Sequence, residues 1–180
     1  MRGKEDYNIV SSEETHIGRF DIVFDRIERD GAVHPYSYVK MKPGVGVLAF
    51  YEGKLVLLKQ YRYIWDMWMW EIPGGAVDEG ETPKEAAVRE IEEETGFVVT
   101  KCEEIGICYP SIGATKEIQH LFYAECKLGN GQHMDSLESI DVELIEVEKF
   151  EQMIRNGEFS HGMGLSAWTQ YKLVRRFEHL

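Results

Sequence analysis

The sequence contains little cysteine and no long apolar run. Its three cysteines, Cys102, Cys108 and Cys126, lack the spacing of a metal site, and their odd number favours free thiols in a reducing cytoplasm. No stretch reaches the ~18 apolar residues of a membrane span. The residues from Met1 to Asp6 also lack the apolar core of a secretory signal. We therefore expect a cytoplasmic protein that does not enter a membrane.

Positive charge is scarce as well, because 20 Lys and Arg stand against 32 Asp and Glu, a net charge of −12. Tight non-specific binding of nucleic acid needs a basic surface, so we expect no nucleic-acid partner. The segment from Asp78 to Glu94 holds eight acidic and two basic residues, a net of 2 − 8 = −6, which is half of the total. A helix with this much like charge repels itself, and a divalent metal ion is the simplest compensation.

Apolar and charged residues make up 43% and 29% of the 180 residues, a composition typical of one ordinary globular domain with room for a small appendage. The first 41 residues favour β structure, with a tight turn at Asp30-Gly31 before a strand-like run from residue 32 to 39. Pro35 within that run indicates an edge position or an irregularity. A second hairpin is predicted around Glu52-Gly53, between strands at 45–51 and 55–61.

Further strands are expected at 98–108, 118–126 and 140–147. Two helical patterns follow. One is marked by Phe150, Met153 and Ile154 and stops near Gly157; the other is marked by Leu165, Trp168, Tyr171 and Val174. Strands and helices interleave without a regular βαβ period, which predicts an α/β fold with a mixed sheet.

The acidic segment has clear helix signals. Thr82 is a suitable N-cap, Pro83 fits the first helical position, and Glu85 completes a capping box. Gly96 is a natural residue to follow the last turn. We therefore predict a helix from residue 83 to 95.

At about 100° per residue, Glu90, Glu93 and Glu94 share one face of this helix. An apolar stripe lies beside that face, formed by Ala87, Val88, Ile91 and Thr95. Glu85 and Glu92 point away and are expected in solvent, while Arg89 can pair with Glu93 or Glu81. The alternative is an ordinary acidic surface helix, but the neighbouring stripe and the loop Pro73-Gly74-Gly75 favour a site. Carboxylate ligands at this spacing suit Mg²⁺ or Mn²⁺ and not zinc.

The segment from Gly75 to Phe97 resembles the Nudix box, G-x5-E-x7-R-E-U-x-E-E-x-G-U, where U is a bulky apolar residue. Every specified position is filled, namely by Gly75, Glu81, Arg89, Glu90, Ile91, Glu93, Glu94, Gly96 and Phe97. A motif of this length is a specific signal. Three flanking segments, 59–62, 71–75 and 109–117, resemble the ADP-ribose pyrophosphatase branch of that family. Two positions depart from the branch, which commonly has alanine at Gly74 and often proline at Ile112.

This resemblance implies a Nudix-type α/β/α sandwich with a mixed sheet for residues 42–180. Residues 1–41 would form an added β hairpin element that serves dimerisation and base binding. The implied reaction is Mg²⁺-dependent hydrolysis of the pyrophosphate bond of a nucleoside diphosphate sugar, with ADP-ribose giving AMP and ribose 5-phosphate. Other nucleoside diphosphate derivatives, or a module that senses a nucleotide without cleaving it, are the alternatives. We expect a homodimer.

The resemblance also implies roles for individual residues. Metal ions, Mg²⁺ or its substitute Mn²⁺, would be held by Glu90, Glu93, Glu94 and the Gly74 carbonyl. Glu117 would be the general base, and its alternative is a loop glutamate without a role. Arg89 would orient the acidic residues of the box, and Gly75, Glu81 and Gly96 would be structural.

Substrate contacts are assigned to Arg62, Phe20 and Tyr36. Arg62 is either a bidentate phosphate donor or a surface arginine at a strand end. Phe20 and Tyr36 either stack on the base or belong to a core.

The run 65–70 contains three tryptophans. We expect Trp70 to be buried and Trp65 or Trp68 to lie at a dimer contact. The six histidines lack ligand spacing and are assigned no chemistry; they are His16, His34, His120, His133, His161 and His179.

Overall fold

The computed structural model describes residue 3, residues 6–129 and residues 139–177, the last four of these by their backbone only. His133, His179 and the side chain of Val174 therefore lie outside the described part. The chain divides into two compact units. Unit 1 comprises Met1–Lys42 and Tyr109–Glu117, and unit 2 comprises Pro43–Cys108 and Ile118–Leu180.

Unit 2 is built on a mixed sheet of six strands, in the order β10-β5-β4-β9-β7 with β6 paired to β5. The strands are β4 (Gly44–Tyr51), β5 (Lys54–Arg62), β6 (Met67–Glu71), β7 (Phe97–Cys108), β9 (Gln119–Leu128) and β10 (Ile140–Ile145). β4 and β9 run parallel, whereas the other neighbours run antiparallel. The mixed sheet predicted from the sequence is therefore confirmed.

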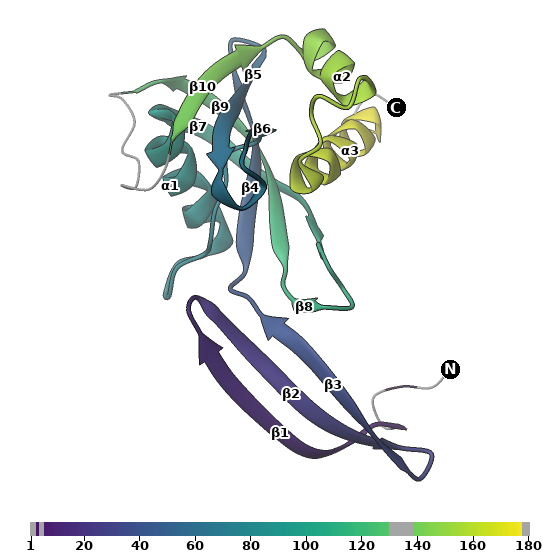
Figure 1. Ribbon diagram of the computed structural model, residues 1–180. Helices are drawn as coiled ribbons and strands as arrows, with labels where there is room; N and C mark the ends of the chain where they lie inside the picture. The colour runs from purple at the N-terminus through teal and green to yellow at the C-terminus, as the bar shows by residue number, and fades with distance from the viewer. Residues whose placement is uncertain (1–2, 4–5, 130–138, 178–180) are drawn as a thin grey trace. The chain divides into compact units, whose positions relative to one another are not determined.

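Helices cover both faces of this sheet, with α1 (Pro83–Thr95) on one side and α2 (Val147–Arg155) and α3 (Gly162–Phe177) on the other (Figure 1). β4 shows why two cores form. Val45 and Val47 pack with Ile91 of α1, whereas Leu48 packs with Phe150 of α2 on the opposite face. Alternate side chains of a strand point to opposite faces, so an apolar strand buried on both faces needs a helix layer on each side. The α/β/α sandwich is confirmed.

Unit 1 is a small sheet in the order β1-β2-β3-β8. Its strands are β1 (Asn8–Ile17), β2 (Phe20–Arg29), β3 (Ala32–Lys40) and β8 (Thr115–Lys116). The sequence predicted a hairpin here, and β1 adds a third long strand whose ten residues are all exposed. β8 pairs in parallel with β3 only at Val39 and Lys40, so Pro35 lies on a stretch that β8 does not reach. A proline in such a position removes no hydrogen bond to β8.

Both predicted hairpin turns are present. Asp30 and Gly31 have φ of 51° and 78°, and Glu52 and Gly53 have φ of 50° and 80°. Two successive residues with positive φ match the twist of the flanking strands and give tight two-residue turns.

The tryptophan run begins in η2 (Tyr63–Trp65), a short 3₁₀ turn, and continues along β6. Trp70 is partly buried against the core under α2 and α3, whereas Trp65 and Trp68 are 65% and 46% exposed. Their place at a dimer contact stays a prediction. None of the helices in the described ranges is both long and apolar enough to span a lipid bilayer.

Candidate active site

The acidic helix forms as its sequence predicts. α1 spans Pro83–Thr95, with a complete capping box in which the Glu85 N–H donates to Thr82 Oγ1 at 3.3 Å and the Thr82 N–H donates to Glu85 Oε2 at 2.8 Å. Gly96 follows the last turn at φ 72°, and its N–H donates to the Glu92 carbonyl. Ile91 is fully buried, and Glu85 and Glu92 are exposed. The apolar stripe therefore fixes which side of the helix carries Glu90, Glu93 and Glu94.

Arg89 gathers the acidic side chains around it. Its Nε and Nη2 donate to the two oxygens of Glu81 at 2.9 and 3.0 Å, and its Nη1 donates to Glu90 at 2.9 Å and to Glu93 at 3.0 Å. A further bond runs from Nη2 to the Ala76 carbonyl at 3.0 Å. We call Glu81, Arg89, Glu90 and Glu93 the Arg89 cluster. The sequence left Glu81 and Glu93 as alternative partners, and Arg89 binds both.

The charges of this cluster stabilise one another. The hydrogen bond from Arg89 lowers the pKa of Glu81 below its ordinary value, and the hydrogen bonds to Glu81 and its neighbours raise the pKa of Arg89. The guanidinium is only 29% exposed, and its planar fork matches the carboxylate of Glu81 in a two-pronged contact. Arg89 thus balances part of the like charge that the sequence concentrates on this helix.

The loop Pro73-Gly74-Gly75 links β6 to the box. The Pro73 and Gly75 carbonyls accept from Val47 N–H and Val45 N–H, each at 2.8 Å. Between them, the Gly74 N–H turns to the helix and donates to Glu94 Oε2 at 2.9 Å. Glu94 is 6% exposed, so this carboxylate is held in a largely dry position.

Glycine is needed at both positions of the loop. A Cβ on Gly75 would overlap the Glu90 carboxylate, and a Cβ on Gly74 would overlap the Val45 carbonyl oxygen. The first overlap accounts for glycine at the start of the box, because a side chain at position 75 would displace the Glu90 carboxylate that Arg89 holds. The second means that alanine at position 74 would require the loop to move away from β4.

The three glutamates proposed as metal ligands bond to different partners in the structure. Among the residues that the structure describes, no three His, Cys, Asp or Glu side chains gather closely enough to form a ready metal cage. The reason is that Glu90 and Glu93 turn to Arg89 while Glu94 turns to the Gly74 N–H. The donor chemistry nevertheless fits a hard divalent cation, since all three side chains offer carboxylate oxygens from adjacent turns. The glycine cradle around Glu90 keeps one of them close to the loop.

A second arginine–glutamate pair lies just before the loop. Arg62, at the end of β5, donates from Nε and Nη2 to the two oxygens of Glu71 at 2.6 and 2.5 Å. His161 lies beside them, with Nε2 at 4.0 Å from Glu71 Oε2, and its Nδ1 accepts the Ile72 N–H at 3.3 Å. We call Arg62, Glu71 and His161 the Arg62 cluster.

The Arg62 cluster alters two sequence-based interpretations. Arg62 is a bidentate donor, and in the structure its Nε and Nη2 both donate to the Glu71 carboxylate. Its side chain is 44% exposed, which leaves it accessible from solvent. His161 was assigned no chemistry, and burial lowers its pKa. Ninety residues separate His161 from Glu71, so no local spacing could have revealed their contact.

The remaining predicted site residues, Phe20, Tyr36 and Glu117, belong to unit 1. In the β2–β3 register Tyr36 lies opposite Asp25, five residues from Phe20. Paired residues share a face and alternate residues change face, so Phe20 and Tyr36 lie on opposite faces of this sheet. One chain therefore does not bring these two rings together on a single base.

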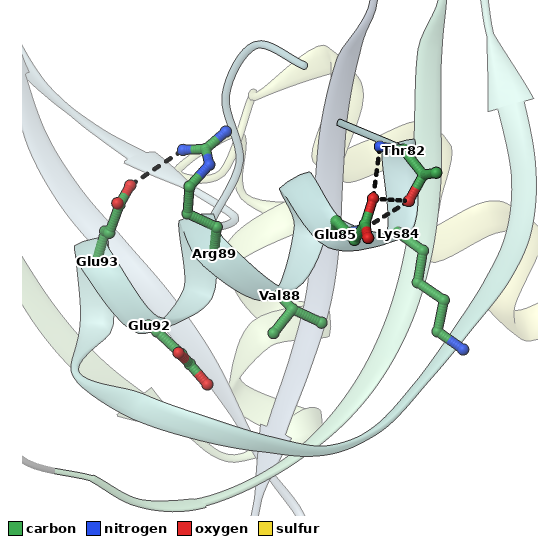
Figure 2. A pocket seen from close by; sticks show the side chains of 7 residues that line it. All are labelled: Thr82, Lys84, Glu85, Val88, Arg89, Glu92 and Glu93. Carbon is green, nitrogen blue, oxygen red and sulfur yellow. Dashed lines mark hydrogen bonds and ion pairs between the residues drawn. The ribbon is translucent and has the colours of Figure 1, made fainter. Parts of the chain in front are cut away.

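A cavity of about 740 Å³ follows the solvent side of α1 (Figure 2). Its lining includes Arg89, Glu92 and Glu93 toward one end of the helix, and Val88 and Lys84 further along it. Glu93 is the member of the acidic face that opens into this cavity, and its side chain is 46% exposed. Of the Arg89 cluster, Arg89 and Glu93 therefore border this cavity.

Comparison with known proteins now decides the family. The NUDIX domain model matches residues 40–162, more than half of the chain. The ADP-ribose pyrophosphatase of Bacillus subtilis (strain 168) is 32% identical over 154 residues, which cover 83% of each chain. The chain belongs to the Nudix family. The resemblance that the box residues predicted is therefore confirmed, and the protein is a Nudix hydrolase.

Two further likenesses place this Nudix hydrolase among its relatives. The methanol dehydrogenase activator of Bacillus methanolicus is 30% identical over 175 residues, 94% of this chain and 95% of that protein. A solved structure of an ADP compounds hydrolase has a TM-score of 0.86, covering 99% of this chain and 98% of the other at 16% identity. That likeness supports the shared Nudix fold. Nudix hydrolases generally use divalent metal ions, and this Nudix hydrolase keeps every acidic residue of the box.

Proposed function

We propose that this Nudix hydrolase cleaves the pyrophosphate bond of a nucleoside diphosphate sugar with Mg²⁺, and that ADP-ribose is converted to AMP and ribose 5-phosphate. The carrying observation is the intact box, in which Arg89 holds Glu81, Glu90 and Glu93 while Glu94 holds the Gly74 peptide. The name of the Bacillus subtilis relative supports the choice of substrate. The protein acts in the cytoplasm as a homodimer.

Glu90, Glu93, Glu94 and the Gly74 carbonyl hold the metal, with Mn²⁺ as a possible substitute. When bound, Mg²⁺ neutralises the diphosphate and makes a bound water more acidic. We assign the Gly74 carbonyl to this task because the N–H of the same residue already bonds to Glu94, another of the proposed ligands.

The protein side chains divide the remaining work. Glu117 acts as the general base and accepts a proton from the attacking water. Arg89 contacts no substrate; it fixes the directions of Glu90 and Glu93 through hydrogen bonds. Arg62 contacts a phosphate of the substrate, and Glu71 holds the guanidinium by its Nε and Nη2.

The base is held by the aromatic rings of unit 1. Because Phe20 and Tyr36 lie on opposite faces of their sheet, a clamp that used both rings would take one from each subunit of the homodimer. Phe20→Ala then raises KM for the nucleotide more than it lowers kcat. An unchanged KM would remove Phe20 from the base site.

Two alternatives remain to be compared with this proposal: cleavage of a different substrate, and nucleotide sensing without cleavage. Another nucleoside diphosphate sugar or a dinucleotide would use the same acidic residues, because the box handles the diphosphate and not the attached group. A nucleotide-sensing role is the second, and the methanol dehydrogenase activator shows that a relative can be named for its effect on another enzyme. The complete box favours catalysis over sensing.

The deciding experiment is product identification from a panel of nucleotide sugars and dinucleotides with Mg²⁺, Mn²⁺ or EDTA. We expect AMP and ribose 5-phosphate from ADP-ribose, and no product in EDTA. Preference for another compound would move the substrate within the class. Intact compounds throughout the panel after long incubation would favour the sensing role.

Metal binding can be tested without turnover. Saturating Mg²⁺ stabilises the folded protein by about 2.7 kcal/mol at 100 times Kd, which raises Tm by roughly 5–10 °C. Glu94→Gln is expected to abolish most of that rise, because it removes the buried ligand charge. A wild-type Tm that ignores Mg²⁺ and Mn²⁺ would argue against the ligand assignment.

A further inference from the structure

His161 lies where the start of α3 meets the end of β6, next to the loop Pro73-Gly74-Gly75. It directly precedes α3, and its carbonyl accepts the first-turn N–H of Leu165 at 2.9 Å. Its side chain is 20% exposed and contacts two residues of the strand-to-loop junction, Glu71 and Ile72. The next two residues after Ile72 are Pro73 and Gly74, so His161 touches the peptide from which the loop begins.

Close packing holds His161 in this place. A Cβ on Gly46 would lie 2.6 Å from Met163 Sδ, and a Cβ on Gly164 would lie 2.5 Å from the Phe159 ring. The first turn of α3 therefore packs closely against β4 and against Phe159, and a side chain at Gly46 or Gly164 would displace Met163 or Phe159. This packing places the His161 backbone beside the junction between β6 and the loop.

The hydrogen bond to Ile72 defines the imidazole's tautomer. A ring nitrogen that accepts an N–H carries no proton, so Nδ1 is bare and the neutral ring carries its proton on Nε2. Nε2 faces the Glu71 carboxylate at 4.0 Å, and this negative charge favours the proton at that nitrogen. Arg62 in turn holds Glu71 by two hydrogen bonds.

We propose that His161 is a positioning residue of the hydrolase, which fixes the Ile72 peptide and thereby the Gly74 carbonyl and the Gly74 N–H that holds Glu94. His161 acts through these groups and touches neither substrate nor metal. The inference rests on the proposed function in one respect, the use of the Gly74 carbonyl as a ligand. The contact with Ile72 stands independently of it.

Two substitutions separate this role from simple packing. His161→Asn keeps an acceptor oxygen near the position of Nδ1, whereas His161→Phe keeps a planar ring and removes the acceptor. His120→Asn is the matched control, because His120 is 24% exposed and also faces a carboxylate, that of Glu104 at 2.8 Å. The kcat of each variant is measured well below its Tm and is expressed per mole of folded protein.

We expect His161→Phe to lower kcat about tenfold, since small misplacements of a catalytic group have effects of this size. His161→Asn should recover kcat to within about twofold of wild type, and His120→Asn should not differ from it. A folded His161→Phe with wild-type kcat would overturn the proposal. Equal loss of kcat in His161→Asn and His161→Phe would also overturn it, because the acceptor atom retained by Asn would then have no effect on turnover.

Two readouts need no turnover. Long-range ¹H–¹⁵N spectra at neutral pH should show His161 protonated on Nε2, and amide exchange at Ile72 should accelerate in His161→Phe but not in His161→Asn. The Mn²⁺ dissociation constant should rise about tenfold in His161→Phe. The opposite tautomer, or an Ile72 amide that exchanges equally in all variants, would refute the contact. If the wild type hydrolyses nothing in the panel, the spectra and amide exchange still decide on His161, and the proposed function fails separately.

Discussion

The Arg89 cluster and the Arg62 cluster stand at the two ends of one short loop and are built in opposite ways. Arg62, Glu71 and His161 come from three segments and precede the loop, where His161 holds the Ile72 N–H. Arg89 and its partners come from one helix and the turn before it, and Arg89 holds the Ala76 carbonyl where the loop ends. The loop that carries Gly74 is thus held at its start by the His161 imidazole and at its end by the Arg89 guanidinium.

The two arginines differ in how firmly they are bound. Arg89 donates to four residues and is 29% exposed, whereas Arg62 gives two donors to Glu71 and is 44% exposed. A guanidinium with its donors engaged holds other groups in place, while a more exposed one can still meet a ligand. Arg89 therefore holds four neighbouring groups in place, whereas Arg62 is the more exposed of the two and is the one proposed to contact substrate.

The largest effect is expected at Glu93. Glu93→Gln removes a ligand charge without changing shape, so kcat should fall by roughly three orders of magnitude while circular dichroism and Tm stay near wild type. Glu92→Gln is the control, because Glu92 is exposed beside Glu93 but is not among the residues assigned to the metal, so its kcat should stay within about twofold of wild type. Near-normal turnover in Glu93→Gln would contradict the ligand assignment.

Arg89→Met should have the next largest effect. Without the guanidinium, Glu81 and Glu90, with side chains only 16% and 14% exposed, lose their shared partner. We expect about 2 kcal/mol lower stability in urea unfolding, and about 100-fold lower kcat because Glu90 and Glu93 lose their orientation. Arg155→Met, which removes a 64% exposed side chain, should change stability by less than about 0.5 kcal/mol. Equal effects in the two variants would contradict the claim that Arg89 holds the acidic residues in place.

Breaking the Arg62 cluster should affect binding instead. Glu71→Gln loosens the bidentate contact with Arg62, so we expect KM for the nucleotide to rise about tenfold while kcat changes less than about threefold. Glu103→Gln, at the exposed pair with Lys101, is the control and should leave both constants unchanged. A loss in kcat alone would place Glu71 with the Arg89 cluster in function.

The smallest expected effect is on stability in acid, where the two clusters lose their contributions to folding in different pH ranges. Burial lowers the pKa of His161; the charge of Glu71 opposes this shift, and that of Arg62 adds to it. The stability that the neutral imidazole contributes to the fold is therefore complete above the ordinary pKa of 6.5. It is lost as pH falls through the lower pKa of the folded state. Glu81 behaves in the same direction but below its ordinary value of 4.5, because Arg89 lowers its pKa.

Urea unfolding between pH 7 and pH 3 can check this separation. His161→Asn should flatten the dependence of stability on pH below 6.5, and Glu81→Gln should flatten it only below 4.5. If His161→Asn left the slope between pH 6.5 and 4.5 unchanged, the imidazole would not be held neutral by the fold.

The elements that were predicted correctly from the sequence are those that local signals determine. α1 was predicted with its bounds because Thr82, Pro83, Glu85 and Gly96 act within a few residues of where they stand. The two β turns were predicted for the same reason, since Asp-Gly and Glu-Gly pairs set backbone angles locally. β1 was missed because its ten residues are all exposed, and a strand without a buried face lacks a clear alternating pattern.

Within the site, the partners of Arg89 could be named in advance, but the direction of each carboxylate could not. Angular positions on a helix give a shared face, and they do not decide whether Glu90 turns to a metal or to a guanidinium. The contact of His161 with Ile72 depends on glycines in β4 and α3 that let two distant segments approach.

The sequence by itself determined the family, the acidic helix and the order of residues in the box, because short-range rules of capping, turn formation and helical spacing govern them. Tertiary structure alone decided that Glu71 binds Arg62, that His161 faces both Glu71 and Ile72, and that Phe20 and Tyr36 lie on opposite faces of a sheet. The physical reason is that such contacts follow from packing and strand register, which join residues that no local pattern connects.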